Sequence, residues 1–270
     1  MGGVKITMNM TKKKFKTALF DLDGTLVDTE EVKVTFRQVA IDHGYTEEEA
    51  YGIYDEARTK GHEIAITFDY FLTVLADSLQ KIGKELDVDV VGRYKDILDK
   101  LPKAVEGAEE LVESGVENSE EYYLISLGVP EWQVEKLKTS GLDRYFFTEN
   151  SQEHKANVIC TVDNRPNARK AEAMRDMFGG EDFTGEGFVL FNDKPYETAR
   201  MLRAFPKLVA FSPKAKGDKR YGEEDFEKVK QEFGDRFDWA FNLEVLREKF
   251  ENFPNPEKFN NPEGFTGVKR

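Results

Sequence analysis

The sequence FKTALFDLDGTLVDTE, residues Phe15–Glu30, contains the features that decide the fold. It begins with a short apolar run, Phe15–Phe20, which is typical of a buried strand, and it then changes abruptly to the acidic turn Asp21–Gly24. Side chains alternate between the two faces of a strand, so the carboxylates of Asp21 and Asp23 point the same way. Clustered carboxylates at the end of a buried strand are unfavourable unless a cation or a substrate proton compensates them. The segment therefore predicts a strand that leads into a site for a divalent cation or a phosphate.

The next part of the chain, residues 29–102, has little strand character and reads as helical. The pattern is clearest where Ile64, Phe68, Phe71, Leu72 and Leu75 follow the three-and-four spacing of one apolar helix face. We predict helices at Glu30–His43, Glu47–Thr59, Glu63–Ile82 and Val88–Lys100. An all-helical insertion directly after the first strand predicts a second domain, residues 29–102.

After Pro102 the chain alternates between strands and helices, which is the pattern of a parallel sheet covered by helices on both faces. The predicted strands are Tyr122–Ser126, Arg144–Thr148, Val158–Val162, Phe188–Phe191, Leu208–Phe211 and Asp238–Asn242. We therefore predict an α/β, Rossmann-like core made of residues 1–28 and 103–270. Within it, residues 1–14 are expected to be a loose leader and residues 251–270 an irregular tail.

Composition excludes several classes of partner. The chain has 270 residues, of which 34% are charged and 39% apolar, and its net charge is −13. This charge argues against nucleic acid or an anionic membrane as the main partner, and no run approaches the roughly 18 apolar residues of a membrane span. The single cysteine, Cys160, cannot form an internal disulfide, which is typical of a reducing compartment. We expect a cytoplasmic protein that attracts an anionic substrate through local cations.

The segment DLDGTLVDT, Asp21–Thr29, resembles the first motif of the haloacid-dehalogenase-like (HAD) hydrolase superfamily, in its phosphatase branch. The resemblance implies that Asp21 is a nucleophile that becomes an aspartyl-phosphate, and that Asp23 protonates the leaving oxygen and later deprotonates water. The dehalogenase branch has no acid two residues after the nucleophile, so Asp23 favours phosphoryl transfer. The resemblance also identifies the helical insertion as a cap over the active site.

The second and third motifs of the superfamily are an apolar strand that ends in Ser or Thr, and a basic residue. Ser126 ends the run YYLIS, and its hydroxyl, with the backbone N–H of Leu127, would bind phosphate oxygens. The third motif is normally a lysine, often followed by proline. The matching residue here is Arg165, before Pro166, and Lys155 is the alternative cation. Arginine is not interchangeable with a lysine point charge.

The fourth motif supplies further acids, and the run FVLFNDKPYE resembles it. Asp193 matches the first acid and Glu197, four residues later, the second, whereas Asn192 stands where glycine is usual. A helix-N-terminal acid is the alternative reading of Glu197. The resemblance implies that Asp21, Asp193 and the backbone carbonyl of Asp23 hold Mg²⁺.

The sequence thus predicts a Mg²⁺-dependent phosphatase that hydrolyses a small phosphorylated metabolite through an aspartyl-phosphate. Two alternatives remain open. One is a phosphomutase or phosphotransferase that passes the phosphoryl group to a sugar. The other is a binding or regulatory protein that keeps the fold and has lost turnover.

Overall fold

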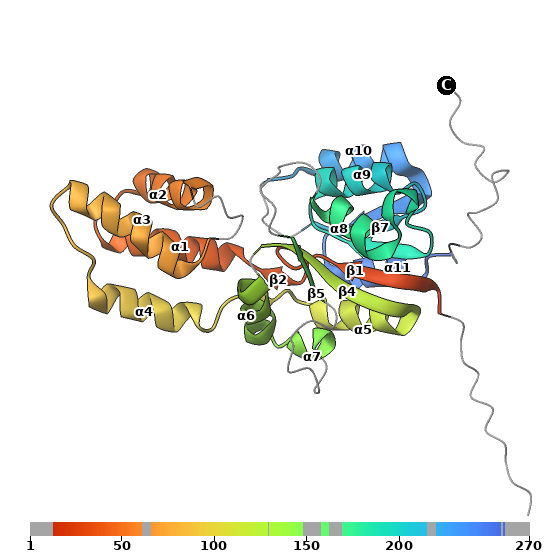
Figure 1. Cartoon of the computed structure of the whole chain (residues 1–270), viewed down its shortest axis with the longest axis horizontal. Coiled ribbons are helices and arrows are strands. Elements are labelled where there is room, and N and C mark those ends of the chain that lie inside the picture. Colours follow the sequence, from red (N-terminus) through yellow and green to blue (C-terminus); the bar gives the residue numbers. More distant parts are fainter. Residues whose placement is uncertain are drawn as a thin grey trace, which may run out of the picture.

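A parallel six-stranded sheet forms the centre of the larger part of the protein (Figure 1). The computed structural model describes residues 13–60, 66–128, 130–147, 158–161, 169–214, 220–254 and 256. Within these residues the strand order is β5-β4-β1-β6-β7-β8, and every neighbouring pair is parallel. The strands are β1 (Phe15–Phe20), β4 (Ser119–Leu127), β5 (Val158–Thr161), β6 (Phe188–Phe191), β7 (Val209–Pro213) and β8 (Phe237–Ala240). The predicted α/β, Rossmann-like core is confirmed.

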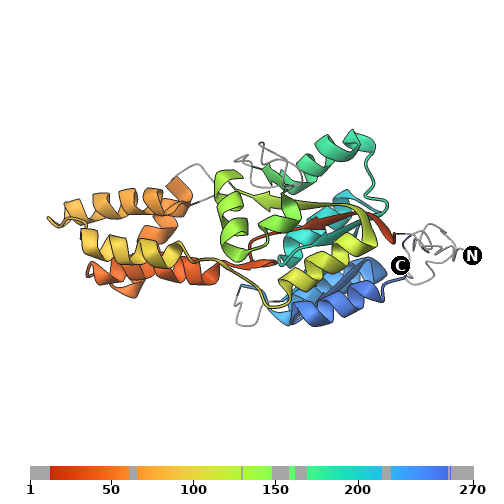
Figure 2. The same ribbon diagram turned by 90° about the horizontal axis from the view of Figure 1, so that it is seen from below.

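Helices cover both faces of this sheet, and the side chains of β1 alternate between the two resulting cores. Phe20 faces the core beneath α5 (Ala108–Asn118) and α11 (Leu243–Glu251). Leu19 faces the opposite core, beneath α8 (Arg169–Phe178), α9 (Pro195–Ala204) and α10 (Glu223–Phe233). Figure 2 shows α5 and α11 side by side over their face. Helix α5 approaches β1 closely because Gly115 has no side chain, and a Cβ there would lie 2.4 Å from the ring of Phe20.

Four further helices lie to one side of the sheet and form a helical unit with its own core (Figure 1). They are α1 (Glu30–Asp42), α2 (Glu47–Lys60), α3 (Phe68–Lys81) and α4 (Val88–Leu98). Their core includes Phe36 of α1 and Phe71 of α3, whose ring centroids are 5.3 Å apart. Three of these helices agree with the predicted ranges to within two residues. The third, predicted from Glu63, begins only at Phe68, because Thr67 is extended and caps the helix by accepting from the N–H of Tyr70. Residues 61–65 lie outside the described part.

A short antiparallel ribbon joins the helical unit to the sheet. It consists of β2 (Val27–Asp28) and β3 (Lys103–Ala104), so the chain leaves and re-enters the α/β part at one place. Neither strand was predicted, because two residues carry no periodic signal.

The segment after β4 contains α6 (Pro130–Ser140) and α7 (Asp143–Phe146). The strand predicted at Arg144–Thr148 is wrong. Its aromatic run suggested β-structure, but in the structure only Phe146 of α7 is fully buried, and it packs edge-on to Phe20 in the core. Helix α10 was not predicted, although Phe226, Val229 and Phe233 show the spacing of one helix face.

The end of the predicted leader is attached to the core. Lys13 donates hydrogen bonds to carbonyls of Val116 and Glu117, and Lys14 to those of Phe250 and Glu251. These carbonyls lie at the C-terminal ends of α5 and α11, where cations are favourable. Residues 1–12 lie outside the described part, as do 257–270 of the predicted tail. No helix among the described residues is long and apolar enough to cross a membrane.

Candidate active site

Three neighbouring strands end at the same edge of the sheet and place polar side chains there. β1 pairs with β4 and β6, so the residues that end or follow these strands, Asp21, Ser126 and Asp193, come to one edge. All three are at most 2% exposed. In open α/β sheets, ligands bind at the carboxyl ends of the strands. The site predicted from the sequence therefore has its first three members at one place.

Lys170, in the first turn of α8, is the buried cation of this site. Its ammonium group lies 2.8 Å from Oδ1 of Asp21, 2.9 Å from Oε2 of Glu197 and 3.0 Å from Oδ1 of Asn192. Burial alone would lower the pKa of Lys170, but the carboxylates of Asp21 and Glu197 outweigh it and raise the pKa. Burial would likewise raise the pKa of Glu197, but Lys170 and Lys194 lower it to about 2. Both groups are charged at neutral pH.

Sequence reasoning missed Lys170, because it searched for a cation at a strand end. Arg165 and Lys155, the residues that it chose, lie outside the described part of the chain. A usable signal was present: Lys170 lies four residues before the buried Met174, on the apolar face of α8. A lysine on the buried face of an amphipathic helix requires a partner of opposite charge.

Asp193 follows β6 and is held against the loop after β1. Its backbone N–H donates to Oγ1 of Thr25, and its Oδ2 accepts from Arg220 at 2.9 Å. Gly24, at φ +84°, permits this approach, because a Cβ there would lie 2.3 Å from the same Oδ2. Burial raises the pKa of Asp193 to about 7, and the nearby carboxylate of Asp21 adds to this while Lys194 and Arg220 oppose it.

Asp23 is held by a different element, helix α6. Its Oδ1 accepts from Nζ of Lys136 at 2.6 Å, and its Oδ2 accepts from Nε2 of Gln133 at 3.3 Å. Burial would raise the pKa of Asp23, but Lys136 more than offsets this, so the pKa is lowered. The two acids of the first motif thus have separate cationic partners, Lys170 for Asp21 and Lys136 for Asp23.

The strand end at Ser126 and Leu127 contributes an unpartnered donor. The hydroxyl of Ser126 is buried and has no hydrogen-bond partner within the described structure. The backbone carbonyl of Leu127 accepts from Gln133 at 2.8 Å. A buried hydroxyl without a partner is unfavourable for folding, and a phosphate oxygen would satisfy it. The predicted roles of Ser126 and of the Leu127 N–H stay predictions.

The residues present fit a hard divalent cation such as Mg²⁺. Oδ2 of Asp21 and Oδ1 of Asp193 are buried and accept no hydrogen bond from the described residues, and carboxylate oxygens are the ligands that Mg²⁺ prefers. The described residues contain no group of three His, Cys, Asp or Glu side chains arranged around one point. The carboxylate of Asp23 is directed to α6, and the metal ligands expected from the sequence, Asp21, Asp193 and the backbone carbonyl of Asp23, stay a prediction.

The charges of the site balance within the described residues. Its four carboxylates, Asp21, Asp23, Asp193 and Glu197, are matched by four cations, Lys136, Lys170, Lys194 and Arg220. Lys194 lies 3.9 Å from Oδ2 of Asp21, and although burial would lower its pKa, Asp21 and Asp193 raise it above the usual range. The cluster is therefore close to neutral in a protein whose net charge is −13. It meets the requirement for local cations that an anionic substrate imposes.

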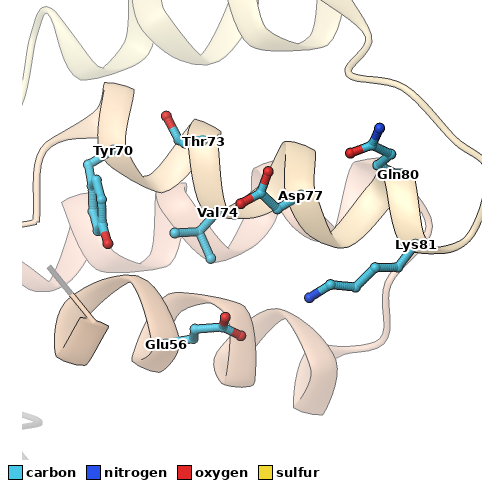
Figure 3. Close-up of a pocket in the computed structure, with 7 residues that line it drawn as sticks. All are labelled: Glu56, Tyr70, Thr73, Val74, Asp77, Gln80 and Lys81. Carbon is cyan, nitrogen blue, oxygen red and sulfur yellow. The ribbon is translucent and has the colours of Figure 1, made fainter.

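The helical unit has a groove of its own. It lies between α2 and α3, has a volume of about 410 Å³ and is lined mostly by polar side chains, including Glu56, Asp77 and Lys81 (Figure 3). None of the residues that line it belongs to the carboxylate cluster at the sheet edge.

Comparisons with known proteins identify the fold. No protein-family model matches the chain, and no curated protein matches it at a significant level. Among solved structures, a Bacillus subtilis protein described as a HAD hydrolase and bound to magnesium is 17% identical, with a TM-score of 0.53, and the match covers 87% of this chain and 98% of that one. The L-2-haloacid dehalogenase of Xanthobacter autotrophicus is 13% identical, with a TM-score of 0.54 and coverage of 89% and 100%.

A HAD-family hydrolase from Deinococcus radiodurans with bound phosphate and sodium is 20% identical, with a TM-score of 0.51 and coverage of 88% and 96%. These structures match nearly their whole length, so the chain has the haloacid-dehalogenase-like fold. Identities of 13–20% establish the fold and leave the reaction to be argued from the residues of this chain.

Proposed function

We propose that the protein is a Mg²⁺-dependent phosphatase that hydrolyses a small phosphorylated metabolite. The observation that carries the proposal is the pair Asp21 and Asp23, two carboxylates at the end of β1 that are held by different cations, Lys170 and Lys136. A nucleophile and a proton carrier need separate environments. Dehalogenation has no step that uses the second acid, which favours phosphoryl transfer.

The first half of the reaction forms a covalent intermediate. A carboxylate oxygen of Asp21 attacks phosphorus, and the bond from phosphorus to the leaving oxygen breaks while Asp23 gives that oxygen a proton. Asp23 acts in this step in its protonated form, which is the minor form at neutral pH because Lys136 lowers its pKa. Lys170 fixes the orientation of Asp21 through Oδ1. The buried hydroxyl of Ser126 donates to an oxygen of the phosphoryl group. The products are the free alcohol and an aspartyl-phosphate.

The second half hydrolyses that intermediate. The carboxylate of Asp23 takes a proton from water, the water oxygen bonds to phosphorus, and the bond between phosphorus and Asp21 breaks. Inorganic phosphate leaves and both acids return to their first state. Mg²⁺ held by Asp21, Asp193 and the backbone carbonyl of Asp23 would neutralise charge between the carboxylates and the phosphoryl group.

Hydrolysis of 4-nitrophenyl phosphate by the purified protein tests the proposal. We expect turnover with Mg²⁺, none with chelator, and a loss of at least roughly 10⁴-fold for Asp21→Asn, since the nucleophile is removed. Asp96→Asn, at an exposed position of α4, is the matched control and should retain full activity. Turnover of a 2-haloacid with none of any phosphate ester would refute phosphatase function. Transfer to an added sugar in preference to water would identify a phosphotransferase.

A further inference from the structure

Helix α6 places two buried polar side chains against Asp23. Gln133 is 1% exposed and Lys136 is 6% exposed, and they lie three residues apart, on one face of the helix. Both hydrogen bonds to the carboxylate of Asp23 in the described structure come from these two side chains, one to each oxygen. The carboxylate is therefore fixed in direction from outside its own loop.

Helix α6 also contacts the end of β4, where Ser126 would bind the phosphoryl group. Nε2 of Gln133 donates to the carbonyl of Leu127 at 2.8 Å, one residue after Ser126. One amide group thus contacts both the acid of the first motif and the strand end of the second. This arrangement sets the position of Asp23 relative to the hydroxyl that would hold the phosphoryl group.

Helix α6 also contacts the helical unit. Trp132 packs against the core of α1–α4, and its ring centroid lies 5.6 Å from Nζ of Lys136. The ammonium group therefore contacts both an aromatic face and the carboxylate of Asp23, and both contacts favour a cation. A lysine used only for solubility would remain exposed, as Lys138 of the same helix does.

We infer that Lys136 and Gln133 are positioning residues for Asp23, which fix the proton carrier relative to the phosphoryl group. This inference rests on the proposed phosphatase function. Neither residue exchanges a proton with the substrate. Their effect follows from geometry, because a displacement of about 1 Å in a catalytic group can lower the rate by roughly 100-fold.

Leaving-group dependence separates this role from a structural one. The parameter kcat/KM reports the steps up to breakage of the bond to the leaving oxygen. An alkyl alkoxide needs the proton of Asp23, whereas 4-nitrophenolate leaves without it. We expect Lys136→Met to lower kcat/KM for an alkyl phosphate by roughly 10- to 100-fold, and for 4-nitrophenyl phosphate by less than about threefold. Gln133→Leu should also lower kcat/KM for the alkyl phosphate more than for 4-nitrophenyl phosphate, with a smaller loss than Lys136→Met. Lys138→Met is the matched control and should change neither value.

Equal losses on both substrates would show that Lys136 only stabilises the fold, and no loss on either would exclude a role. Both results overturn the inference.

A thermal unfolding cycle tests the contact without activity. Asp23→Asn leaves the buried ammonium group of Lys136 without its carboxylate, and Lys136→Met leaves the half-buried carboxylate of Asp23 without its cation, so each should lower Tm. The Tm of the double variant should be roughly 2–6 °C higher than the value obtained by adding the two single-variant shifts. Additive shifts would overturn the inference even if the wild type is an active phosphatase. Conversely, a wild type without phosphatase activity would refute the proposed function, and the cycle would still decide whether Lys136 holds Asp23.

Discussion

Replacement of Lys170 by methionine should destabilise the protein strongly. The side chain of Lys170 is 1% exposed and contacts two carboxylates, Asp21 at 2.8 Å and Glu197 at 2.9 Å. Methionine keeps the length of the side chain but leaves both acids without this partner. Removal of one partner of a buried ion pair costs about 3–5 kcal/mol.

The pKa of Glu197 gives a second magnitude, to which Lys170 contributes most and Lys194 contributes further. It falls from 4.5 to about 2 in the folded protein, and a depression of this size corresponds to about 3 kcal/mol of stability. Because the folded pKa is depressed, this stability is present above pH 4.5 and is lost as the pH falls towards 2. The deficit of the variant should therefore be largest near pH 7.5 and smaller at pH 3.5.

Scanning calorimetry in a buffer with chelator measures the effect. A loss of this size corresponds to a fall in Tm of about 6–15 °C for a chain of this length. Lys170→Met with Glu197→Gln should recover part of the loss, because one unpaired charge is removed. Lys95→Met, at an exposed position of α4, should change the stability by less than about 0.5 kcal/mol. A Tm of Lys170→Met within 2 °C of the wild type, roughly 1 kcal/mol, would refute the assignment of Lys170 as the buried cation of the site.

Three further predictions concern other residues. Ser126→Ala removes an unpartnered buried hydroxyl, so we expect an unchanged or higher Tm together with roughly tenfold weaker inhibition by inorganic phosphate; unchanged inhibition would contradict a phosphate contact. Asp193 has a raised folded pKa of about 7, so between pH 3.8 and 7 the unfolded chain releases a proton that the folded protein keeps, and stability falls as the pH rises. The Tm of metal-free Asp193→Asn should therefore rise relative to that of the metal-free wild type as the pH increases from 3.8 to 7. A difference in Tm that stays constant over this range would contradict the raised pKa. Gly115→Ala brings a methyl group against Phe20 and should lower the free energy of unfolding, measured by calorimetry, by about 1–3 kcal/mol. An unchanged free energy of unfolding would show that α5 can move away from β1.

The fold could be predicted from the sequence because most of its strands contain a short apolar run, although β4 and β8 also contain acidic residues and were predicted with other bounds. Residues Phe15–Phe20 and Phe188–Phe191 were assigned with their observed bounds for this reason. The aromatic run near Phe146 led to a wrong strand prediction. A single helical turn with one buried side produces an apolar pattern that is similar to that of a short strand. Hydrophobic periodicity needs several turns before it separates helix from strand.

The candidate site was predicted only where its residues follow strands. Asp21, Ser126 and Asp193 could be placed together because parallel strands bring their carboxyl ends to one edge. Lys170 and Lys136 reach the same edge from helices, and their placement depends on how α8 and α6 pack. Such tertiary contacts cannot be predicted from the local sequence. The only local indication is a lysine on the face of the helix that is otherwise apolar.

The central position of β1 has a consequence for biosynthesis. This strand precedes both of its neighbours in the chain, and the second of them, β6, begins only at Phe188. At translation rates of about 5–20 residues per second, roughly 10–30 s separate the two strands on the ribosome. During that interval α1–α4 can close their own core, while the nascent β1 strand lacks one or both of its neighbouring strands, and unpaired strand edges favour aggregation. Asp21 and Asp193 come together only after β1 and β6 have paired. The candidate active site of a nascent chain therefore forms late, when this pairing is complete.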